Sequence, residues 1–209
     1  ATQSGLDGDE VILPQQGDIA RTNYHFLGWS PSPTATEPFA NYTMAPSDIT
    51  LYAVWSLIPG IAAFSGATTV IDTQSGYIYG LAPGITQAEF ESAYIALTGN
   101  GRLEYSPETG SIGTGTTVKV IDNITGLAVQ SFTVLIYGDV NSDGNINGLD
   151  AGIMVNVENY MTAWDAITDA ALIKAGDING DGNINGLDAG IAVNVENYLA
   201  EINQVTGLV

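Results

Sequence analysis

Two stretches in the last third of the chain repeat one another almost without change. Residues 138–161 and 176–199 align without a gap at an offset of 38 positions (177 − 139). Surface positions of a repeat that serves folding alone are free to diverge. Because the outward positions match here as well, we expect each copy to present the same face. The copies differ only at Val140/Ile178, Ser142/Gly180, Met154/Ala192 and Met161/Leu199.

Each copy opens with a twelve-residue loop rich in oxygen ligands. Asp139, Asn141 and Asp143 stand at positions 1, 3 and 5 of the first loop, and Gly144 at position 6 permits a sharp turn. Calcium is a hard cation that takes about six to eight oxygen ligands in such loops. The spacing therefore predicts two bound calcium ions as cofactors. The predicted ligands are Asp139, Asn141, Asp143, Asn145, Asn147 and Asp150 in one loop and Asp177, Asn179, Asp181, Asn183, Asn185 and Asp188 in the other.

Two features separate these loops from the general EF-hand. Position 12 is an aspartate in both copies, where the EF-hand has a glutamate. The residues before the first loop, 133–137, are β-formers, so no helix enters it, whereas a helix is expected to leave each loop over 149–161 and 187–199. A duplicated calcium loop with an exiting helix and Asp at position 12 resembles the dockerin modules of cellulosomes.

The resemblance implies a protein partner, the cohesin domain, because dockerins contact cohesins through loop positions 10 and 11 and the outer face of the helix. Both copies have Gly-Leu at these positions and no basic residue on the helix, which predicts a more apolar contact than in many dockerins. Inward packing of the two leucines is the alternative. The positions that match the cohesin-contacting face are Gly148, Leu149, Val155, Asn156 and Asn159, with Gly186, Leu187, Val193, Asn194 and Asn197.

Apolar residues on the two helices recur with helical spacing. The members of the stripe stand at i, i+4, i+7 and i+8, the pattern of a helix that packs one face into a core. A further helix, expected over 163–174, would join the two copies. The predicted core stripes are Ile153, Val157, Tyr160 and Met161, and Ile191, Val195, Tyr198 and Leu199.

Residues 58–137 are predicted to form a β-rich companion module. Its one helix is expected over 86–97, where Thr86 and Glu89 have the spacing of a capping box. The stretch 79–86 resembles a small domain that precedes dockerins in bacterial proteins. Because the last strand leads into the first calcium loop without a linker, we expect the two modules to be rigidly coupled. Strands are expected at 69–72, 77–80, 102–105, 117–122 and 129–137.

Residues 1–57 carry strand and turn signals, with strands expected at 11–13, 24–29 and 49–55. The run 21–29 followed by 48–55 resembles the β-grasp repeats of bacterial surface proteins, of the internalin B-repeat kind, lacking one initial strand. That family implies a spacer or adhesion module. Core packing is expected for Trp29 and Trp55.

Composition excludes several classes of function. Four basic residues stand against 23 acidic ones, a net charge of −19, and nucleic acids and anionic membranes need a basic surface. No cysteine is present, and the single histidine, His25, is expected to be structural. The sequence contains no run of about 18 apolar residues, so no membrane span is predicted. The start at Ala1 is expected to be an interior cut from a longer protein with an upstream export signal.

The expected fold class is therefore multidomain, with two small mainly β (α+β) modules, 1–57 and 58–137, and an all-α dockerin with two calcium loop-helix motifs, 138–209. The expected function is non-catalytic: a secreted, extracellular fragment, monomeric when free, that binds a cohesin, in either of two orientations, to anchor a protein into a polysaccharide-degrading or cell-surface complex. The alternative is an adhesin or spacer fragment whose calcium sites are purely structural. An enzyme is disfavoured because the carboxylates outside the loops are scattered.

Overall fold

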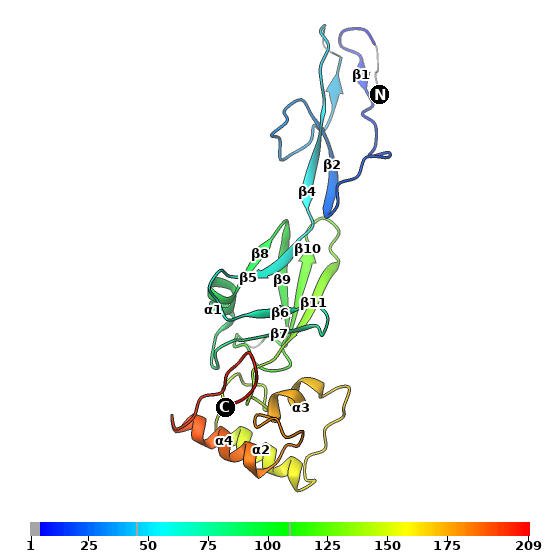
Figure 1. Ribbon diagram of the computed structural model, residues 1–209. Helices are drawn as coiled ribbons and strands as arrows, with labels where there is room; N and C mark the ends of the chain where they lie inside the picture. Colours follow the sequence, from blue (N-terminus) through cyan, green and yellow to red (C-terminus); the bar gives the residue numbers. More distant parts are fainter. Residues whose placement is uncertain (1–4, 45, 109) are drawn as a thin grey trace. The chain divides into compact units, whose positions relative to one another are not determined.

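The chain forms two compact units, Ala1–Pro59 and Gly60–Val209. The computed structural model describes residues 5–44, 46–108 and 110–209 (Figure 1). Residues 1–4 of the predicted first module lie outside the described residues. The second unit contains both the repeat and residues 60–137, for which we keep the name companion module as a label only. The identification of that module and the finer division of the chain at 57 and 137 stay predictions. Each unit is described by itself.

The first unit consists of two short antiparallel sheets. The predicted strand at 11–13 is present only as a two-residue strand that begins one position earlier, and the strand predicted to start at 49 begins at Tyr52. The β-grasp resemblance stays a prediction. The pairs are β1 (Glu10–Val11) with β3 (Tyr42–Thr43), and β2 (Tyr24–Ser30) with β4 (Tyr52–Leu57).

Aromatic side chains hold the larger of these sheets together. The Phe26 ring lies edge-on to Trp29 and to Trp55, with ring centroids 5.4 Å and 5.5 Å apart. The indole N–H of Trp29 donates a hydrogen bond to the carbonyl of Pro14 at 2.6 Å. Trp29 and Trp55 are both half-buried, and these contacts agree with a packing role for both tryptophans within this sheet.

The second unit is built on a five-stranded sheet whose neighbours are antiparallel except for one parallel pair, β7 and β11. All five strands were predicted, and the last one ends at Val134 rather than at Tyr137. A separate antiparallel pair joins β5 (Gly60–Ala63) to β8 (Ile95–Thr98). The order in the sheet is β6 (Val70–Asp72), β7 (Tyr77–Tyr79), β11 (Ala128–Val134), β10 (Thr117–Asp122) and β9 (Gly101–Ser106).

The helix predicted over 86–97 is shorter than expected. It begins with the capping box of Thr86 and Glu89 as α1 (Gln87–Glu89) and continues as one wide π turn over Phe90–Tyr94. Residues 95–98 then form β8, so the prediction of helix through Leu97 was wrong. Ile95 is buried in strand pairing with β5, and this tertiary pairing overrides the helical spacing.

Consecutive residues after β11 point alternately into two different cores. Val134 and Ile136 are buried with Phe90 in the core of the companion module, while Leu135 and Tyr137 are buried in the core of the repeat. Successive side chains of an extended segment point to opposite sides. The segment 134–137 is therefore shared between the two modules, which explains why they form one compact unit.

Three helices make up the repeat region: α2 (Gly148–Glu158), α3 (Ala170–Gly176) and α4 (Gly186–Glu196). No strand occurs among the described residues after 137, so this part is helical as predicted, although long loops separate its helices. α2 and α4 pack against each other (Figure 1). The helix joining the copies was predicted from Ala163 and starts only at Ala170.

Both long helices end three residues before the predicted position, at the same structural motif. Tyr160 has a positive φ of 57°, its N–H donates to the Val157 carbonyl, and the N–H of Met161 donates to the Asn156 carbonyl. This is the Schellman termination of a helix, with tyrosine where glycine is usual. The second copy repeats it, with Tyr198 at a φ of 58°.

The predicted core stripes were therefore wrong in their second halves. Tyr160 and Tyr198 are 95% and 96% exposed, and Met161 and Leu199 are also exposed. The helix period was extended past the true helix ends, and a left-handed residue reverses the direction of the chain. The side chains that α2 and α4 bury most completely are instead Asp150, Ala151 and Met154, and Asp188, Ala189 and Ala192.

The C-terminal residues pack back onto the companion module. The side chain of Gln204 accepts a hydrogen bond from the Tyr137 N–H at 2.8 Å and donates one to the Tyr137 carbonyl at 2.9 Å. The Gln204 carbonyl accepts from the Gly80 N–H at 2.9 Å, and Ile202 is buried in the core of the repeat. Residues 200–209 thus tie the two modules together. Nothing in the sequence pattern predicted this contact.

We expect residues 60–209 to unfold in one cooperative transition in the presence of calcium. Leu135→Ala and Ile136→Ala remove side chains from different cores, and each should lower the free energy of unfolding by about 2–5 kcal/mol. Because the cores share one segment, both variants should shift the same transition in calorimetry of the full chain. Two separate transitions, each shifted by only one variant, would contradict the coupling.

Candidate calcium loops and docking face

One carboxylate closes each loop. Asp150 is fully buried, and it accepts hydrogen bonds from the N–H groups of Val140 at 2.9 Å and Asn141 at 3.2 Å, at the far end of the loop. Its other oxygen accepts from the Asn147 N–H at 2.9 Å, which forms half of the capping box of α2. The same aspartate therefore ties positions 2 and 3 to position 12 and starts the exiting helix.

The second loop repeats this arrangement. Asp188 is fully buried, and it accepts from the N–H groups of Ile178 at 3.0 Å and of Asn179 at 3.2 Å. The Asn185 N–H donates to its other oxygen at 3.0 Å and completes the capping box of α4. Aspartate suits this role because its short side chain reaches the backbone three residues before it, as expected of a first-turn acidic residue.

Asp139 at position 1 of the first loop is fully buried, and one of its oxygens has no partner. Its Oδ2 accepts from the Thr114 N–H at 2.7 Å and from the Gly144 N–H at 3.1 Å. Its Oδ1 is buried without a hydrogen-bond partner. A buried carboxylate oxygen that nothing satisfies is costly, and a cation in the loop would satisfy it.

Burial raises the pKa of three of the loop carboxylates. It raises the pKa of Asp139 to about 6, against the opposing effect of the N–H groups of Thr114 and Gly144. Burial likewise raises the pKa values of Asp150 and Asp188. Without a cation, then, the loops hold carboxylates in surroundings that disfavour their charge.

The outer ligands at positions 3 and 5 are linked by hydrogen bonds within each loop. Oδ1 of Asn141 accepts from the Asp143 N–H at 2.9 Å, and Asp143 accepts from the Asn145 N–H at 2.7 Å. Gly144 has the positive φ of 86° that the predicted turn requires, and Gly182 has 83°. The glycine turn that the loop spacing predicts is therefore present in both copies, and the ligand roles stay a prediction.

Position 9 has a second role that the sequence did not indicate. Oδ1 of Asn147 accepts from the Leu149 N–H at 2.8 Å, and Oδ1 of Asn185 accepts from the Leu187 N–H at 2.7 Å. Each asparagine is thus the N-cap of its helix.

Calcium fits the residues of both loops. The donors in each are oxygens of three Asp carboxylates, Asn side chains and main-chain carbonyls, the set that calcium prefers. Among the residues that the structure describes, no group of three or more His, Cys, Asp or Glu side chains is arranged as a metal site. A bound calcium would supply the positive charge that the clustered carboxylates lack and a partner for the unpaired oxygen of Asp139.

The predicted docking residues lie at the surface of the helix pair. Leu149 and Leu187 are each 68% exposed, which excludes the alternative of inward packing. Gly148, Val155 and Asn159 are exposed, as are Gly186, Val193, Asn194 and Asn197, while Asn156 is half-buried. Nδ2 of Asn159 and of Asn197 donates to a carbonyl of its own helix. Contact with a cohesin through these residues stays a prediction.

The helix pair has reciprocal contacts at its two ends. Oε2 of Glu196, at the end of α4, accepts from the Gly148 N–H at 3.0 Å, at the start of α2. Oε2 of Glu158, at the end of α2, accepts from the Gly186 N–H at the same distance. A carboxylate at a helix N-terminus is favourable. The matched pair relates the two copies by a near two-fold.

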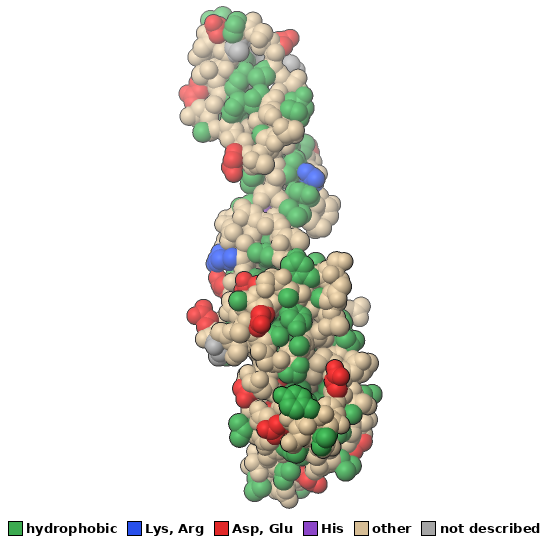
Figure 2. All heavy atoms as spheres, turned by 90° about the vertical axis from the view of Figure 1, so that its left-hand side faces the viewer, with side chains coloured by type: hydrophobic (Ala, Val, Ile, Leu, Met, Phe, Trp, Pro, Cys, Tyr) green, Lys and Arg blue, Asp and Glu red, His purple; other side chains and the backbone are tan. Residues whose placement is uncertain are grey.

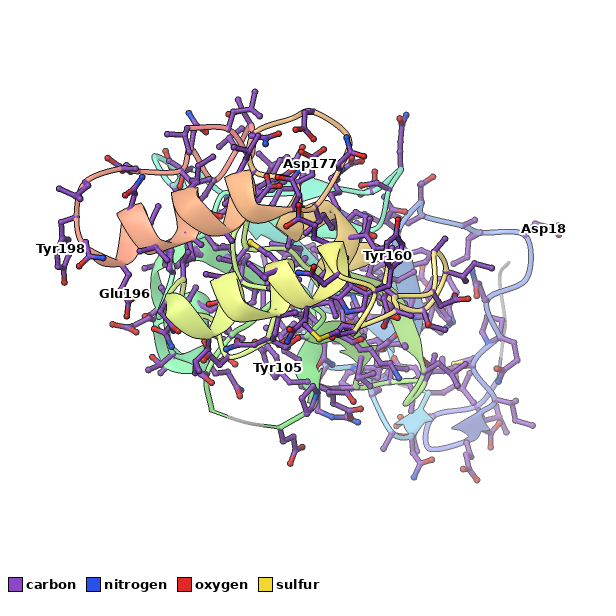
Figure 3. All side chains as sticks on the ribbon, turned by 90° about the horizontal axis from the view of Figure 1, so that it is seen from below. Asp18, Tyr105, Tyr160, Asp177, Glu196 and Tyr198 are labelled. Atoms are coloured by element: carbon purple, nitrogen blue, oxygen red, sulfur yellow. The ribbon has the colours of Figure 1, made fainter. Side chains whose placement is uncertain are left out.

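Two exposed tyrosines were missed as surface residues because the helical period placed them in the core. Figure 3 shows Tyr160 and Tyr198 at opposite ends of the α2–α4 pair, with Glu196 near Tyr198. Each end therefore carries an exposed leucine of one copy and an exposed tyrosine of the other. On the face in Figure 2, acidic and apolar side chains are interspersed over the lower part of the second unit.

Comparison with known proteins supports a dockerin in this region. Residues 137–200 match the family model of the dockerin type I domain. No significant match was found among curated proteins or among solved structures. Within the part of the chain that the structure describes, no helix is long and apolar enough to cross a membrane. Residues 137–200 of the second unit are thus similar to a dockerin type I domain, and this similarity supports a calcium-dependent docking role in general for the region.

Calcium should raise the melting temperature of the second unit. A ligand that binds the folded state alone stabilises it by about 2.7 kcal/mol per site at a hundred times its dissociation constant. Thermal melts of the full chain over a series of free calcium concentrations would measure this, with magnesium at the same concentrations as the control. A melting temperature that does not change with calcium would contradict calcium binding.

Proposed function

We propose that the repeat binds one calcium ion in each loop and docks onto a cohesin through either of two equivalent faces. The observation that carries this proposal is the duplicated, exposed leucine at position 11, Leu149 in one copy and Leu187 in the other. The reciprocal glutamate contacts support it, because they place the two leucines in equivalent surroundings at opposite ends of the helix pair.

Each proposed face combines residues of both copies. The contact between Glu196 and Gly148 brings the end of α4 to the start of α2, so Tyr198 and Leu199 belong to the same end as Leu149. Tyr160 and Met161 belong to the end of Leu187 for the same reason. All six side chains are exposed. Tyrosine is one of the residue types enriched among the few that provide most of the binding energy in protein interfaces.

The two tyrosines adopt a left-handed backbone conformation, which is unfavourable for residues that carry a side chain. A left-handed residue with a side chain costs roughly 1–2 kcal/mol relative to the right-handed conformation, and glycine avoids most of that cost. Tyr160 and Tyr198 nevertheless stand there in both copies, almost completely exposed. Strained residues are concentrated at functional sites, which supports a role in binding for this pair.

The chemistry of the faces indicates the chemistry of the partner. Residues 138–209 contain one basic residue, Lys174, so acidic patches on a cohesin would gain little from this module. A complementary cohesin would offer an apolar surface, with polar or basic groups facing Glu158 and Glu196. In this proposal the module anchors a secreted protein, extracellularly, in a cellulosome-like or cell-surface complex that degrades polysaccharides. The free chain is a monomer in this proposal.

Leucine variants test the two-face proposal. Leu149→Asp or Leu187→Asp alone should leave cohesin affinity nearly unchanged, because the other face remains, whereas the double variant should lose binding by a factor of about a hundred or more. Ile167→Asp is the matched control, since Ile167 is 86% exposed outside both faces. Binding would be measured by calorimetry against cohesins of the source organism. A large loss from one single variant would exclude two faces, and binding that survives excess chelator would exclude calcium-dependent docking.

Tyrosine variants separate stability from binding. Replacing Tyr160 and Tyr198 together by glycine should stabilise the second unit by up to about 1 kcal/mol per site, because glycine fits the left-handed conformation. The same variant should bind a cohesin more weakly. Thermal melts and calorimetry on one preparation would measure both effects. An unchanged affinity would remove the tyrosines from the proposed faces.

A further inference from the structure

The two calcium loops have the same ligand residues but different surroundings. At positions 1, 3, 5, 7, 9 and 12 both loops read Asp, Asn, Asp, Asn, Asn and Asp. Among the described residues, hydrogen bonds join the first loop to the companion module, and none joins the second loop to it. Asp139 is fully buried, whereas its counterpart Asp177 is only half-buried. Any difference between the sites must therefore come from outside the ligand set.

The segment 112–114 of the companion module supplies part of the first site. The N–H of Thr114 donates to Oδ2 of Asp139 at 2.7 Å, which fixes the orientation of the carboxylate. Thr114 is itself fully buried, and its hydroxyl bonds the carbonyl and the N–H of Ile136 at 3.0 Å and 3.1 Å. In the second loop, by contrast, Asp177 accepts from Gly180, Asp181 and Gly182, all within its own loop.

Close packing extends along the first loop. The Gly84 N–H donates to the Gly144 carbonyl at 2.7 Å. A methyl group added at Gly113 would collide with the main chain of Ser142, and one added at Gly144 would collide with the Ile112 carbonyl. A methyl group at Gly182, the counterpart of Gly144, would meet nothing within 4 Å. The companion module therefore packs closely against the turn of the first loop and restricts the conformation of its backbone.

We propose that the segment Ile112–Thr114 is a positioning element for the first calcium loop, so that this loop binds calcium more tightly and releases it more slowly than the second. The inference rests on the calcium loops of the proposed function and assigns them different roles. The first ion is a permanent part of the second unit, and the second ion exchanges with the surroundings.

Three physical effects favour this order. The first loop is held in place by contacts outside itself, so less conformational entropy is lost when calcium binds. Its carboxylates act in a less polar environment, where attraction to a cation is stronger. The unpaired Oδ1 of Asp139 gains a partner only when the ion is bound, whereas Asp177 is half-exposed and has water as an alternative. Outer contacts of this kind change metal affinity by about 10–100-fold.

The companion module covers the first loop without covering the docking face. Gly148 and Leu149 at positions 10 and 11 remain exposed, as do Gly186 and Leu187 in the other copy. Loss of the second ion would therefore affect the second loop and the start of α4, while the first loop stays formed. Calcium concentration would then decide whether one face or both are available.

Calcium release from the full chain tests the inference. Stopped-flow mixing of the calcium-loaded protein with a fluorescent chelator should show two phases of equal amplitude, with rates that differ by about tenfold or more. Asp188→Asn, which impairs the second loop, should remove the fast phase, and Asp150→Asn should remove the slow one. A single phase that releases two equivalents, or the opposite assignment, overturns the inference but leaves the proposed function intact. Release of no calcium overturns both.

Glycine variants test whether the companion module causes the difference. Gly113→Ala should accelerate the slow phase about tenfold and leave the fast phase unchanged. Gly152→Ala is the control, because the added methyl group meets nothing within 4 Å on α2. A slow phase that Gly113→Ala does not change overturns the assigned role of the segment.

A second matched pair decides the question if Gly113→Ala does not fold. Gly144→Ala and Gly182→Ala introduce the same methyl group at the same loop position, and both residues have a positive φ, so the backbone cost is shared. Only Gly144 faces the Ile112 carbonyl. Gly144→Ala should therefore accelerate the slow phase by a larger factor than Gly182→Ala accelerates the fast phase. Equal factors overturn the role of Ile112–Thr114.

Discussion

The position-12 aspartate is the constraint on which the repeat depends. In each copy, one buried carboxylate accepts hydrogen bonds from positions 2, 3 and 9 of its loop, so it closes the loop and caps the helix at once. The aspartates at positions 1 and 5 are held near it as a result. Like charges held this close oppose folding unless a cation compensates them. In the proposed function, calcium binding, helix formation and the display of Leu149 and Leu187 are therefore parts of one structural event.

The repeat does not fold against itself alone. The segment 134–137 sends alternate side chains into the core of the companion module and the core of the repeat, and Gln204 returns to the same segment from the end of the chain. Tyr77 and Tyr79 of β7 also pack against the core of the repeat, whereas Ile78 between them lies in the companion core. The boundary between the two modules is thus a shared layer, through which the companion module influences the first loop.

Near-identity of sequence has two different consequences in this molecule. On the helix pair it produces a near two-fold, with matched glutamate contacts and matched exposed leucines at the two ends. In the loops, nearly identical sequences have different surroundings, because among the described residues only the first loop is hydrogen-bonded to the companion module. The proposed faces are therefore equivalent, while the proposed calcium sites are not. In the proposal, one duplication beside one additional module gives a symmetric docking surface and two calcium sites that differ.

The sequence by itself determined the positions of the two loops, the starts of the helices that leave them and the capping box at Thr86, because each depends on residues a few positions apart. It also identified the strands of the five-stranded sheet of the second unit, whose alternation is local. Only the tertiary structure decided where the helices end, since the left-handed Tyr160 and Tyr198 carry no glycine signal. Likewise, residues 95–98 became a strand because β5 lies beside them. The burial of Asp139 beneath Thr114 was also a tertiary outcome, because it joins residues 25 positions apart whose chemistry alone does not indicate that they meet.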